Sequence, residues 1–452
     1  MLAAALLAGI PATASASAFQ ILEQGPARLG TAFAGTATAT GDASTAFFNP
    51  AGMAQTHGEL ASAGVNAILV ESVFNNDGST AGDGTALERP LPGTEDRTDT
   101  PGYVPNFYYV RPLNQRWTFG LAVNAPFGLE SDYSDDWQGR YLATHSKLRT
   151  INVNPTFAYA INDRLSVGFG IGYQRTSATL GNQIDSYNVC TNAAATNGLS
   201  AASATAYCAA AHGGPGNPAA DSSVRIKGDD SDIVADLSLH WQPTPDTAIG
   251  VTWRQGGNFS LDGTANFDAS ASCAQDPYCN GALAQLDGNI QAKVAFPDTF
   301  TVSASQALGN GLTAQGDIAW TRWSALSSIP IRNTDNGLQI EELQLKYHDT
   351  MRVAFGMTWD TGGAWTWRGG VAYDQSPQTD APYVSPRIPD ANRTWLAAGG
   401  HYAWSKNRSI DVGYAHLFVD NVSINRVSQG NRLRGDFKAH VDIIGVQGNW
   451  RF

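Results

Sequence analysis

The segment Asp163–Gln174, with the sequence DRLSVGFGIGYQ, alternates strictly between two kinds of residue. Its apolar set comprises Leu165, Val167, Phe169, Ile171 and Tyr173. The residues between them, from Ser166 to Gly172, are small or polar. Alternation with a period of two is typical of a β-strand that has one apolar and one polar face.

The same alternation recurs along most of the chain, for example in HDTMRVAFGMTW (348–359) and DIVADLSLHW (232–241). No amphipathic helix of useful length is predicted after residue 18. We predict about fourteen strands, near residues 60–74, 102–112, 116–125, 148–161, 164–182, 223–242, 246–261, 288–308, 311–325, 338–360, 364–375, 393–404, 408–424 and 435–452. In the last strand the apolar phase changes, which predicts a β-bulge near Ile443 and Ile444.

The connections between these strands alternate between short and long. The short ones read LNQ, IND, QPTPD, GN, TGG and SKN. The long ones lie near 75–101, 126–147, 183–222, 262–287, 326–337, 376–392 and 425–434. This pattern, with an even number of strands, is typical of an all-β, 14-stranded antiparallel transmembrane β-barrel of the bacterial outer membrane.

Aromatic residues gather at the short-turn ends of the strands, where an interfacial girdle is expected. These residues are Trp117, Tyr159, Trp241, Trp359, Trp365, Trp404 and Trp450. The chain ends in Phe452, a terminal aromatic residue that favours recognition by the β-barrel assembly machinery. A secreted sandwich or propeller is the soluble alternative, but it predicts neither the loop alternation nor tryptophans on one side.

Composition narrows the class of protein further. The 452 residues carry a net charge of −12, which argues against nucleic-acid binding. Residues 1–18 resemble a signal peptide, with Ala16–Ala18 as the cleavage motif and Phe19 as the mature N-terminus. No Lys or Arg precedes Arg28, so the basic n-region is missing, and a buried helix is the alternative. No later segment has the roughly 18 apolar residues of a transmembrane helix.

Four cysteines allow three disulfide pairings. The pairing Cys190–Cys208 with Cys273–Cys279 closes short loops and suits an oxidising compartment. Zinc binding is the alternative, but the sequence has no C-x-x-C motif and no suitably spaced histidine.

About forty residues of the mature chain precede the first strand. The lumen of a 14-stranded barrel is too wide for wall side chains to fill. We therefore expect residues 19–58, with Phe33, Phe47 and Phe48, to fold inside residues 59–452 as a hatch. Gly168, Gly170 and Gly172 would let this hatch approach the wall closely. A loose periplasmic tail is the alternative, although tails are usually more polar.

The segment ARLGTAFAGTATATGDASTAFFNPAGMA (27–54) resembles the N-terminal hatch of the FadL-type family of outer-membrane transporters for long-chain fatty acids and other hydrophobic compounds. Asn49, Pro50 and Ala51 match the hatch motif of that family. Further segments that match are APFGLESDY, DWQGRY, NPTFAYAINDRLSVGFG, VAYDQSP, RIPDANRTWLAAG and DVGYAHLF.

The resemblance implies a monomer without an energy-coupling partner that takes up its ligand passively. It implies ligand capture in a groove between the third and fourth extracellular loops, and a second pocket beside the mature N-terminus, at Phe19. Release would follow movement of the N-terminal segment, through a lateral gap at a kink in the third strand. Asn124, Pro126 and Gly128 are the candidates for that gap, because proline and glycine interrupt strand pairing. Alternatively, Pro126 simply ends the strand.

A carboxylate ligand would need a cation in an apolar pocket. Arg254, Arg352 and Arg368 are the candidates, and the alternative is that they pair with lumen acids such as Asp236 and Asp317. The sequence has no G-x-S-x-G or H-E-x-x-H motif, so we predict neither an enzyme nor a cofactor. The segment GDDSD (228–232) lacks a full calcium loop, so no metal site is predicted. An aromatic-hydrocarbon channel and a diffusion porin remain the functional alternatives.

Overall fold

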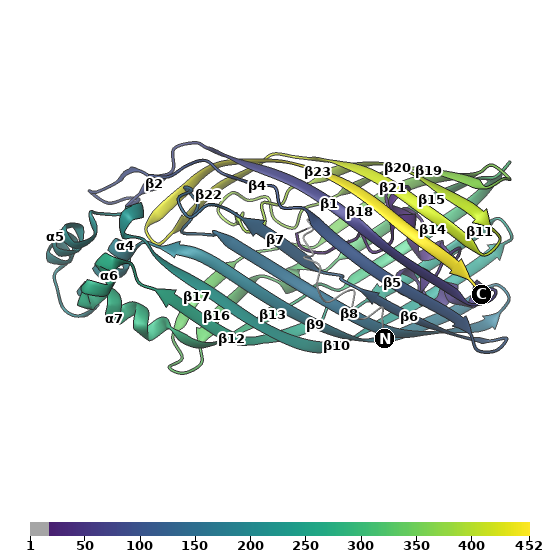
Figure 1. Ribbon diagram of the computed structural model, residues 1–452, viewed down its shortest axis with the longest axis horizontal. Coiled ribbons are helices and arrows are strands. Elements are labelled where there is room, and N and C mark those ends of the chain that lie inside the picture. The colour runs from purple at the N-terminus through teal and green to yellow at the C-terminus, as the bar shows by residue number, and fades with distance from the viewer. Residues whose placement is uncertain (1–17) are drawn as a thin grey trace.

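The computed structural model describes residues 18–452, which form a closed antiparallel β-barrel of 14 strands (Figure 1). β1 (Leu60–Asn76) pairs along its whole length with β23 (Asn431–Arg451), and this pairing closes the sheet. The predicted fold class is therefore confirmed. Most of the predicted signal peptide, residues 1–17, lies outside the described part of the chain.

Each wall strand pairs with its neighbours in chain order, and several strands are interrupted into two labelled parts. The remaining wall strands are β5 (Gly102–Pro112), β6 (Trp117–Asn124), β7 (Gly128–Asp132), β8 (His145–Asn162), β9 (Leu165–Ile184), β10 (Ser222–Thr244), β11 (Thr247–Arg254), β12 (Asn258–Asp268), β13 (Gly288–Ala295), β14 (Thr299–Gly309), β15 (Leu312–Thr321), β16 (Ser328–Asn333), β17 (Gln339–Gln344), β18 (Thr350–Asp360), β19 (Trp365–Asp374), β20 (Arg393–Ser405), β21 (Arg408–Val419) and β22 (Val422–Ser428).

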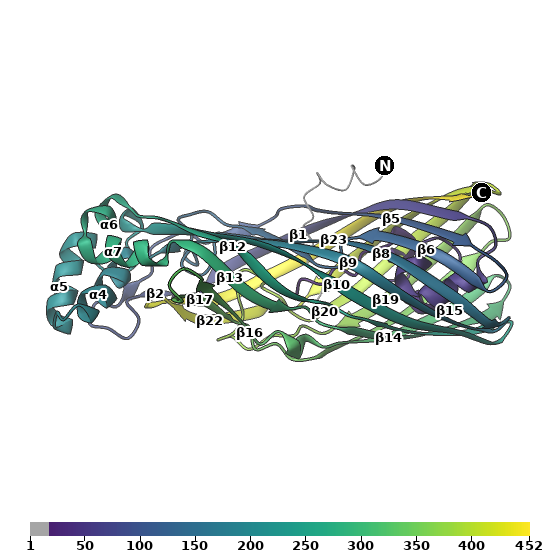
Figure 2. The ribbon, with the colours of Figure 1, turned by 90° about the horizontal axis from the view of Figure 1, so that it is seen from below.

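The long connections gather at one end of the barrel and the C-terminus lies at the other (Figures 1 and 2). The elements of this loop end are β2 (Thr80–Ala81), β3 (Arg89–Pro90), β4 (Arg97–Thr98), α4 (Ser186–Thr196), α5 (Ala201–His212), η3 (Pro218–Ala220), α6 (Ala271–Gln275), α7 (Pro277–Leu286) and η4 (Trp323–Ala325). The sequence predicted no amphipathic helix, and the helices of the loop end were not predicted. These helices are alanine-rich rather than amphipathic, and side-chain caps such as Asp185 and Ser200 begin them.

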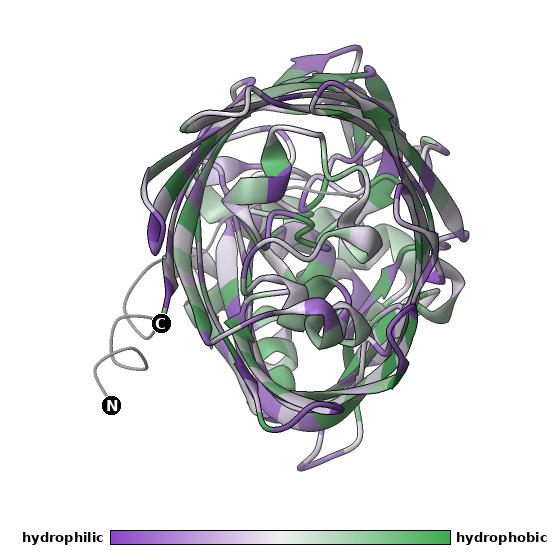
Figure 3. Ribbon diagram, turned by 90° about the vertical axis from the view of Figure 1, so that its right-hand side faces the viewer, coloured by the Kyte–Doolittle hydropathy of each residue, from purple (hydrophilic) through white to green (hydrophobic). Residues whose placement is uncertain are grey.

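Residues 18–59 lie inside the barrel, where short helical turns fill the ring of strands (Figure 3). We call this segment the hatch. Its turns are α2 (Pro26–Leu29), η1 (Thr36–Thr38), α3 (Thr45–Phe48) and η2 (Pro50–Gln55). Hatch residues such as Leu29, Phe33 and Met53 are fully buried against wall residues such as Trp395 and Ile443.

The outward face of the wall is apolar, as a membrane-embedded barrel requires. Leu237, Phe355 and Val371 are 56%, 53% and 47% exposed. The girdle residues Trp117 and Trp241 are likewise exposed, and they lie beside the short connections β5–β6 and β10–β11. Within residues 18–452, no helix is both long and apolar enough to span a membrane.

The last strand, β23, has no bulge, so that prediction was wrong. Its register with β1 runs without a shift through Ile443 and Ile444. Ile443 is fully buried, whereas Ile444 is 47% exposed. Apolar residues occupy both faces because the inner face packs on buried side chains inside the barrel while part of the outer face meets lipid.

Candidate functional site

Asn49 lies at the junction of α3 and η2. Its side-chain oxygen accepts a hydrogen bond from the backbone N–H of Ala51 (3.0 Å). Its amide nitrogen donates to the carbonyl of Ala37 in the hatch and to that of Leu239 in β10 (3.1 Å). One buried side chain therefore closes the turn and also ties the hatch to the wall.

Pro50 and Ala51 follow in the same contact. Pro50 begins η2, where its missing N–H leaves no hydrogen bond unmade. The N–H of Ala51 donates to Ser238 Oγ (2.9 Å), and its carbonyl accepts from Ser166 Oγ (2.7 Å). The Asn-Pro-Ala motif is thus docked by hydroxyls of two adjacent wall strands.

Wall glycines make room for this docking. A Cβ at Gly168 would lie 2.3 Å from a hatch backbone nitrogen, and one at Gly250 would lie 1.9 Å from a hatch carbonyl oxygen. Gly370 is equally close, at 2.2 Å from hatch backbone. The expectation is correct for Gly168 but wrong for Gly170 and Gly172, whose nearest neighbours are polar side chains of other wall strands.

The three hatch phenylalanines form an aromatic cluster. Phe47 and Phe48 meet edge to face at 5.2 Å, and Phe33 lies 6.2 Å from Phe48 and 6.3 Å from Trp395. Phe47 and Phe48 also border a cavity of about 680 Å³, which we call the inner cavity. Phe33 does not border it.

The predicted arginines are all engaged with the hatch or the wall. Arg254 lies 3.6 Å above the ring of Phe47, donates to its carbonyl and borders the inner cavity. Arg352 donates to a hatch carbonyl (2.6 Å). Arg368 forms an ion pair with Asp411. The alternative of pairing within the lumen therefore describes Arg368, and only Arg254 reaches a cavity.

An apolar cavity of about 880 Å³ lies above Phe19, on the side of the loops. We call it the upper pocket. Its lining includes Leu129, Leu180, Ile226, Leu261, Ile331 and Leu345. Phe19 is almost fully buried and meets Trp323 edge to face at 5.0 Å.

Arg387 also lines the upper pocket, and the sequence analysis did not single it out. Its guanidinium donates to Ser146 Oγ (3.2 Å) and Asn182 Oδ1 (3.1 Å), which carry no charge. The one ion-pair contact, to Glu341, is long at 3.8 Å. Burial lowers the pKa of Arg387. The upper pocket therefore has a buried guanidinium at its edge, and the ion pair of this guanidinium with Glu341 is weak because it is long.

No sequence pattern predicts Arg387, because it lies in a long loop, outside any strand alternation. The available signal was its position at the start of RIPDANRTWLAAG, one of the segments that carried the family resemblance. Lys147, the other cationic residue at this pocket, is paired with Glu130 at 2.8 Å.

Three aromatic rings stand between the upper pocket and the inner cavity. The ring centroids of Phe19, Phe127 and Phe296 are separated by 4.6 to 6.0 Å. Phe19 and Phe296 border the upper pocket, and Phe127 borders the inner cavity. Phe19 belongs to the N-terminal segment, whereas Phe127 and Phe296 belong to the barrel.

The third wall strand is interrupted between Asn124, the end of β6, and Gly128, the start of β7. The hatch supplies partners for the interrupted backbone. The N–H of Ile21 donates to the carbonyl of Pro126, and the N–H of Gly128 donates to the carbonyl of Phe19, both at 2.9 Å. Asn124 is buried and accepts a hydrogen bond from Asn152 (3.2 Å). Residues 19–21 thus occupy the interruption of the strand and supply its hydrogen-bond partners, and we call these three residues the stopper.

The wall lacks strand pairing beside this interruption. β5 pairs with β6 only over residues Phe107–Pro112, and β7 pairs with β8. Among residues 18–452, no strand pairing links β7 to the first half of β5. We call this place the wall gap.

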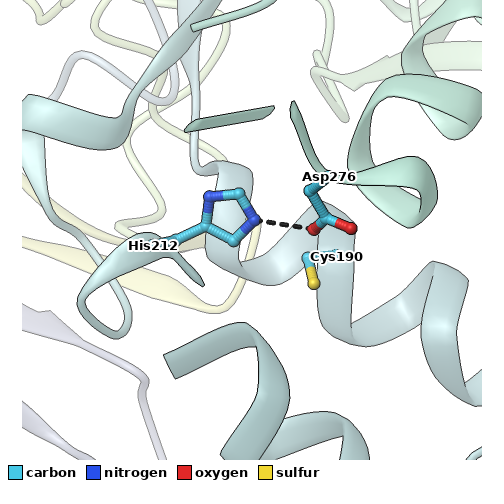
Figure 4. Close-up of side chains that lie close together, drawn as sticks. All are labelled: Cys190, His212 and Asp276. Carbon is cyan, nitrogen blue, oxygen red and sulfur yellow. Dashed lines mark hydrogen bonds and ion pairs between the residues drawn. The ribbon is translucent and has the colours of Figure 1, made fainter. Parts of the chain in front are cut away.

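The loop-end helices are held by two disulfides, Cys190–Cys208 and Cys273–Cys279. Beside the first, His212 contacts Asp276 at 2.8 Å in the buried interface of α5 with α6 and α7 (Figure 4). The sulfur of Cys190 is already bonded and offers no thiolate, so two ligands remain where zinc needs four. The group is a contact between helices.

The family model for outer membrane protein transport proteins (OMPP1/FadL/TodX) matches residues 7–452. The chain is 25% identical to outer membrane protein P1 of Haemophilus influenzae, over 97% of this chain and 96% of that protein. It is also 25% identical to the long-chain fatty acid transport protein of Escherichia coli K12, over 93% and 92%.

Solved structures show the same fold. A FadL homologue of Pseudomonas aeruginosa superposes with a TM-score of 0.85 at 24% identity, covering 96% of this chain and all of that one. The toluene transporter TodX of Pseudomonas putida gives 0.68 at 17% identity, covering 95% and 98%.

Proposed function

Because the chain belongs to the OMPP1/FadL/TodX family of outer membrane transport proteins, we propose that it mediates passive uptake of long-chain fatty acids or similar hydrophobic molecules. One observation carries this proposal. A pocket lined almost entirely by apolar side chains lies next to an interrupted wall strand, and residues 19–21 of the N-terminal segment supply the hydrogen-bond partners of that interruption.

The proposed route begins at the loop end. A shallower cavity of about 780 Å³ between α4, α7 and the wall shares Ile226 with the upper pocket and suits initial capture. The ligand then fills the upper pocket against Phe19. Displacement of Phe19 withdraws residues 19–21 from the broken strand, and the ligand leaves through the wall gap into the bilayer.

We propose that Arg387 recognises the carboxylate of the ligand. Its guanidinium is buried among neutral acceptors, where an unneutralised charge is costly. A ligand carboxylate would supply the missing counter-charge, whereas a neutral hydrocarbon would not. This argument favours fatty acids over aromatic hydrocarbons such as the toluene named for TodX.

Ligand displacement tests this assignment. Purified protein carrying a fluorescent fatty acid is titrated with oleate, oleyl alcohol and toluene. Arg387→Gln should weaken oleate binding about tenfold, close to 1.4 kcal/mol, and leave oleyl alcohol unchanged. Arg426→Gln is the matched control, because Arg426 is a partly buried arginine whose guanidinium donates to carbonyls outside the upper pocket. Equal losses for acid and alcohol would contradict the role of Arg387, and preferential binding of toluene would indicate the aromatic-hydrocarbon function.

The remaining assignments are also proposals. We propose that residues 19–58 act as a hatch domain and residues 59–452 as the barrel, that the chain works as a monomer, and that transport involves no covalent step. The exposed terminal Phe452 supports assembly by the β-barrel assembly machinery.

A further inference from the structure

A group of cationic side chains occupies the outer surface of three neighbouring wall strands. Lys147 and Arg149 lie on β8, Arg175 on β9, and Arg225 and Lys227 on β10. The strand register brings them together, since Lys147 and Lys227 both lie opposite Thr179. We call these five residues the cationic face.

The outward direction follows from the alternation of each strand. Thr150 and Asn152 on β8 are buried, and so are Gln174 and Thr176 on β9. Residues of the opposite parity, including Arg149 and Arg175, therefore point away from the lumen. Figure 2 shows β8, β9 and β10 side by side along the wall.

The cationic face stands immediately above the apolar band of the wall. The apolar band begins at Ile151 on β8, at Tyr173 on β9 and, beyond Asp229 and Ser231, at Ile233 on β10. They are 43%, 48% and 58% exposed. Because the loop end lies above them, the five cations are at the height of lipid headgroups on the loop side of the membrane.

Acidic residues share this surface, since Asp132 on β7 lies opposite His145 and Asp262 on β12 lies opposite Asp229, and both are exposed. Lys147 is paired with Glu130 (2.8 Å) and Arg175 with Asp229 (3.0 Å). Within residues 18–452, Arg149, Arg225 and Lys227 form no ion pair. Arg149 Nε is in addition buried without a hydrogen-bond partner. Four carboxylates therefore accompany the five cations, and the three cations without an ion pair are the ones available to an anionic headgroup.

Hydroxyl groups lie between the cations. In the register of β8, β9 and β10, Ser177 lies opposite Arg149 and Asp229, and Thr179 lies between the two lysines. These two hydroxyl groups are therefore neighbours of guanidinium and ammonium groups on the outward face. Such a set of groups suits a phosphate monoester, which accepts hydrogen bonds from arginine forks and from hydroxyls.

We propose that the cationic face binds the diphosphorylated glucosamine headgroup of lipid A in the outer leaflet, with the acyl chains lying against Ile151, Tyr173 and Ile233. Cations next to a membrane attract anionic headgroups with about 1 kcal/mol each. Lys147 also borders the upper pocket, whereas Arg149, Arg225 and Lys227 do not, so these three residues separate the site from the proposed transport route. It is nevertheless close to it, because Arg149 lies opposite Gly128, the first residue after the wall-strand interruption. The bound lipid stands one strand away from the wall gap.

Native mass spectrometry of the purified full-length protein tests this proposal. The probes are diphosphorylated lipid A, its dephosphorylated analogue and phosphatidylglycerol. The variant combines Arg149→Gln, Arg225→Gln and Lys227→Gln. The control combines Arg97→Gln, Arg434→Gln and Lys438→Gln, which remove the same charge from exposed positions on β4 and β23.

We expect the wild type and the control to retain diphosphorylated lipid A, and the triple variant to bind it at least about tenfold more weakly. Fatty acid displacement by the triple variant should stay at the wild-type level, which separates this site from the transport route. Equal retention by the triple variant, or equal binding of the dephosphorylated analogue or of phosphatidylglycerol by the wild type, would overturn the proposal. If the triple variant does not assemble, Arg225→Gln alone is measured, and an unchanged affinity would count against the site.

Discussion

At the scale of single residues, buried polar groups decide how the hatch sits in the barrel. Asn49 uses its oxygen within the turn and its nitrogen toward the wall. The side chain of Glu23, in contrast, makes no hydrogen bond that would hold the hatch. It is fully buried, and neither of its carboxylate oxygens has a hydrogen-bond partner among the described residues. One residue holds the hatch in place and the other weakens it.

Replacing Asn49 with Ala should loosen the hatch without preventing barrel assembly. The substitution removes the tie to Leu239 and leaves the Ala51 N–H with Ser238 only. We expect a several-fold increase in the entry of small hydrophilic solutes, measured by liposome swelling. Pro50→Ala should have a smaller effect, since alanine fits the same helical turn. Asn114→Ala is the control, because Asn114 caps a short wall turn away from the hatch. A tight barrel in the Asn49 variant would exclude this role.

Glu23 makes hatch docking sensitive to pH. Burial raises its pKa from 4.5 to about 7, although Arg393 and Arg352 oppose the shift and Asp374 adds to it. The undocked carboxyl group ionises near 4.5, so docking is most favourable below that pH and weakens as the pH rises to about 7. The opening equilibrium should increase on the order of 100-fold across this window, because each pKa unit is a factor of ten.

Hydrogen exchange of residues 19–48 between pH 4.5 and 8, corrected for intrinsic rates, measures this effect. Glu23→Gln should make protection independent of pH across the window. Glu88→Gln, at an exposed loop position, should behave as the wild type. Equal pH dependence in wild type and Glu23→Gln would show that another group is responsible.

At the scale of elements, alternation with a period of two placed most of the wall strands, because every strand has a lipid face and a lumen face, but β7 and β16 lie inside the predicted connections 126–147 and 326–337. It could not place the helices of the loop end, whose alanine-rich sequences have no apolar stripe and whose stability depends on caps and disulfides. It also could not decide whether Pro126 ends a strand or interrupts one. That outcome depends on residues 19–21, more than one hundred positions earlier in the chain, which supply the hydrogen bonds for the break.

The candidate site was predictable only in part for the same reason. The phenylalanines and the Asn-Pro-Ala motif are adjacent in sequence and resemble a known hatch. The upper pocket gathers residues from many strands and one loop, and its cation, Arg387, follows no local pattern. Two of the three arginines that the alternation suggested, Arg254 and Arg352, donate hydrogen bonds to backbone carbonyls of the hatch instead.

Locking the stopper into the broken strand should block release without blocking binding. Gln20 and Phe127 are partners in an antiparallel bridge, where Cβ atoms lie about 4.5–5.5 Å apart. We expect the double variant Gln20→Cys/Phe127→Cys to form a disulfide, to bind fatty acid when purified, and to lose most uptake in cells. Mild reductant should restore uptake. Each single variant, with and without reductant, controls for the loss of Phe127 and for reduction of the native disulfides. Normal uptake by the oxidised double variant would exclude movement of residues 19–21 as the release step.

At the scale of the whole molecule, the barrel is divided along its axis. The loop end carries the disulfide-bonded helices, the upper pocket and the cationic face, whereas the hatch and the tryptophan girdle lie toward the other end. This difference between the two ends gives the proposed transport route a direction, from the loop end toward the hatch. A hydrophobic ligand meets an apolar path from the loop end as far as Phe19. Below Phe19 it meets polar groups such as Arg254 and Gln174, so a sideways exit avoids them.

The direction of this axis in the membrane can be tested with an inserted epitope. Ala204 is unsuitable for an insertion, because that residue is 2% exposed inside α5. Gly198, with a φ of +93° in the exposed turn between α4 and α5, can accept an insertion without breaking a helix. An epitope there should be detected on intact cells, because the loop end faces the outside if the long loops are extracellular. An epitope in the short turn at Gly362 should be detected only after permeabilisation. The reverse pattern would place the upper pocket on the periplasmic side and would rule out uptake by the proposed route.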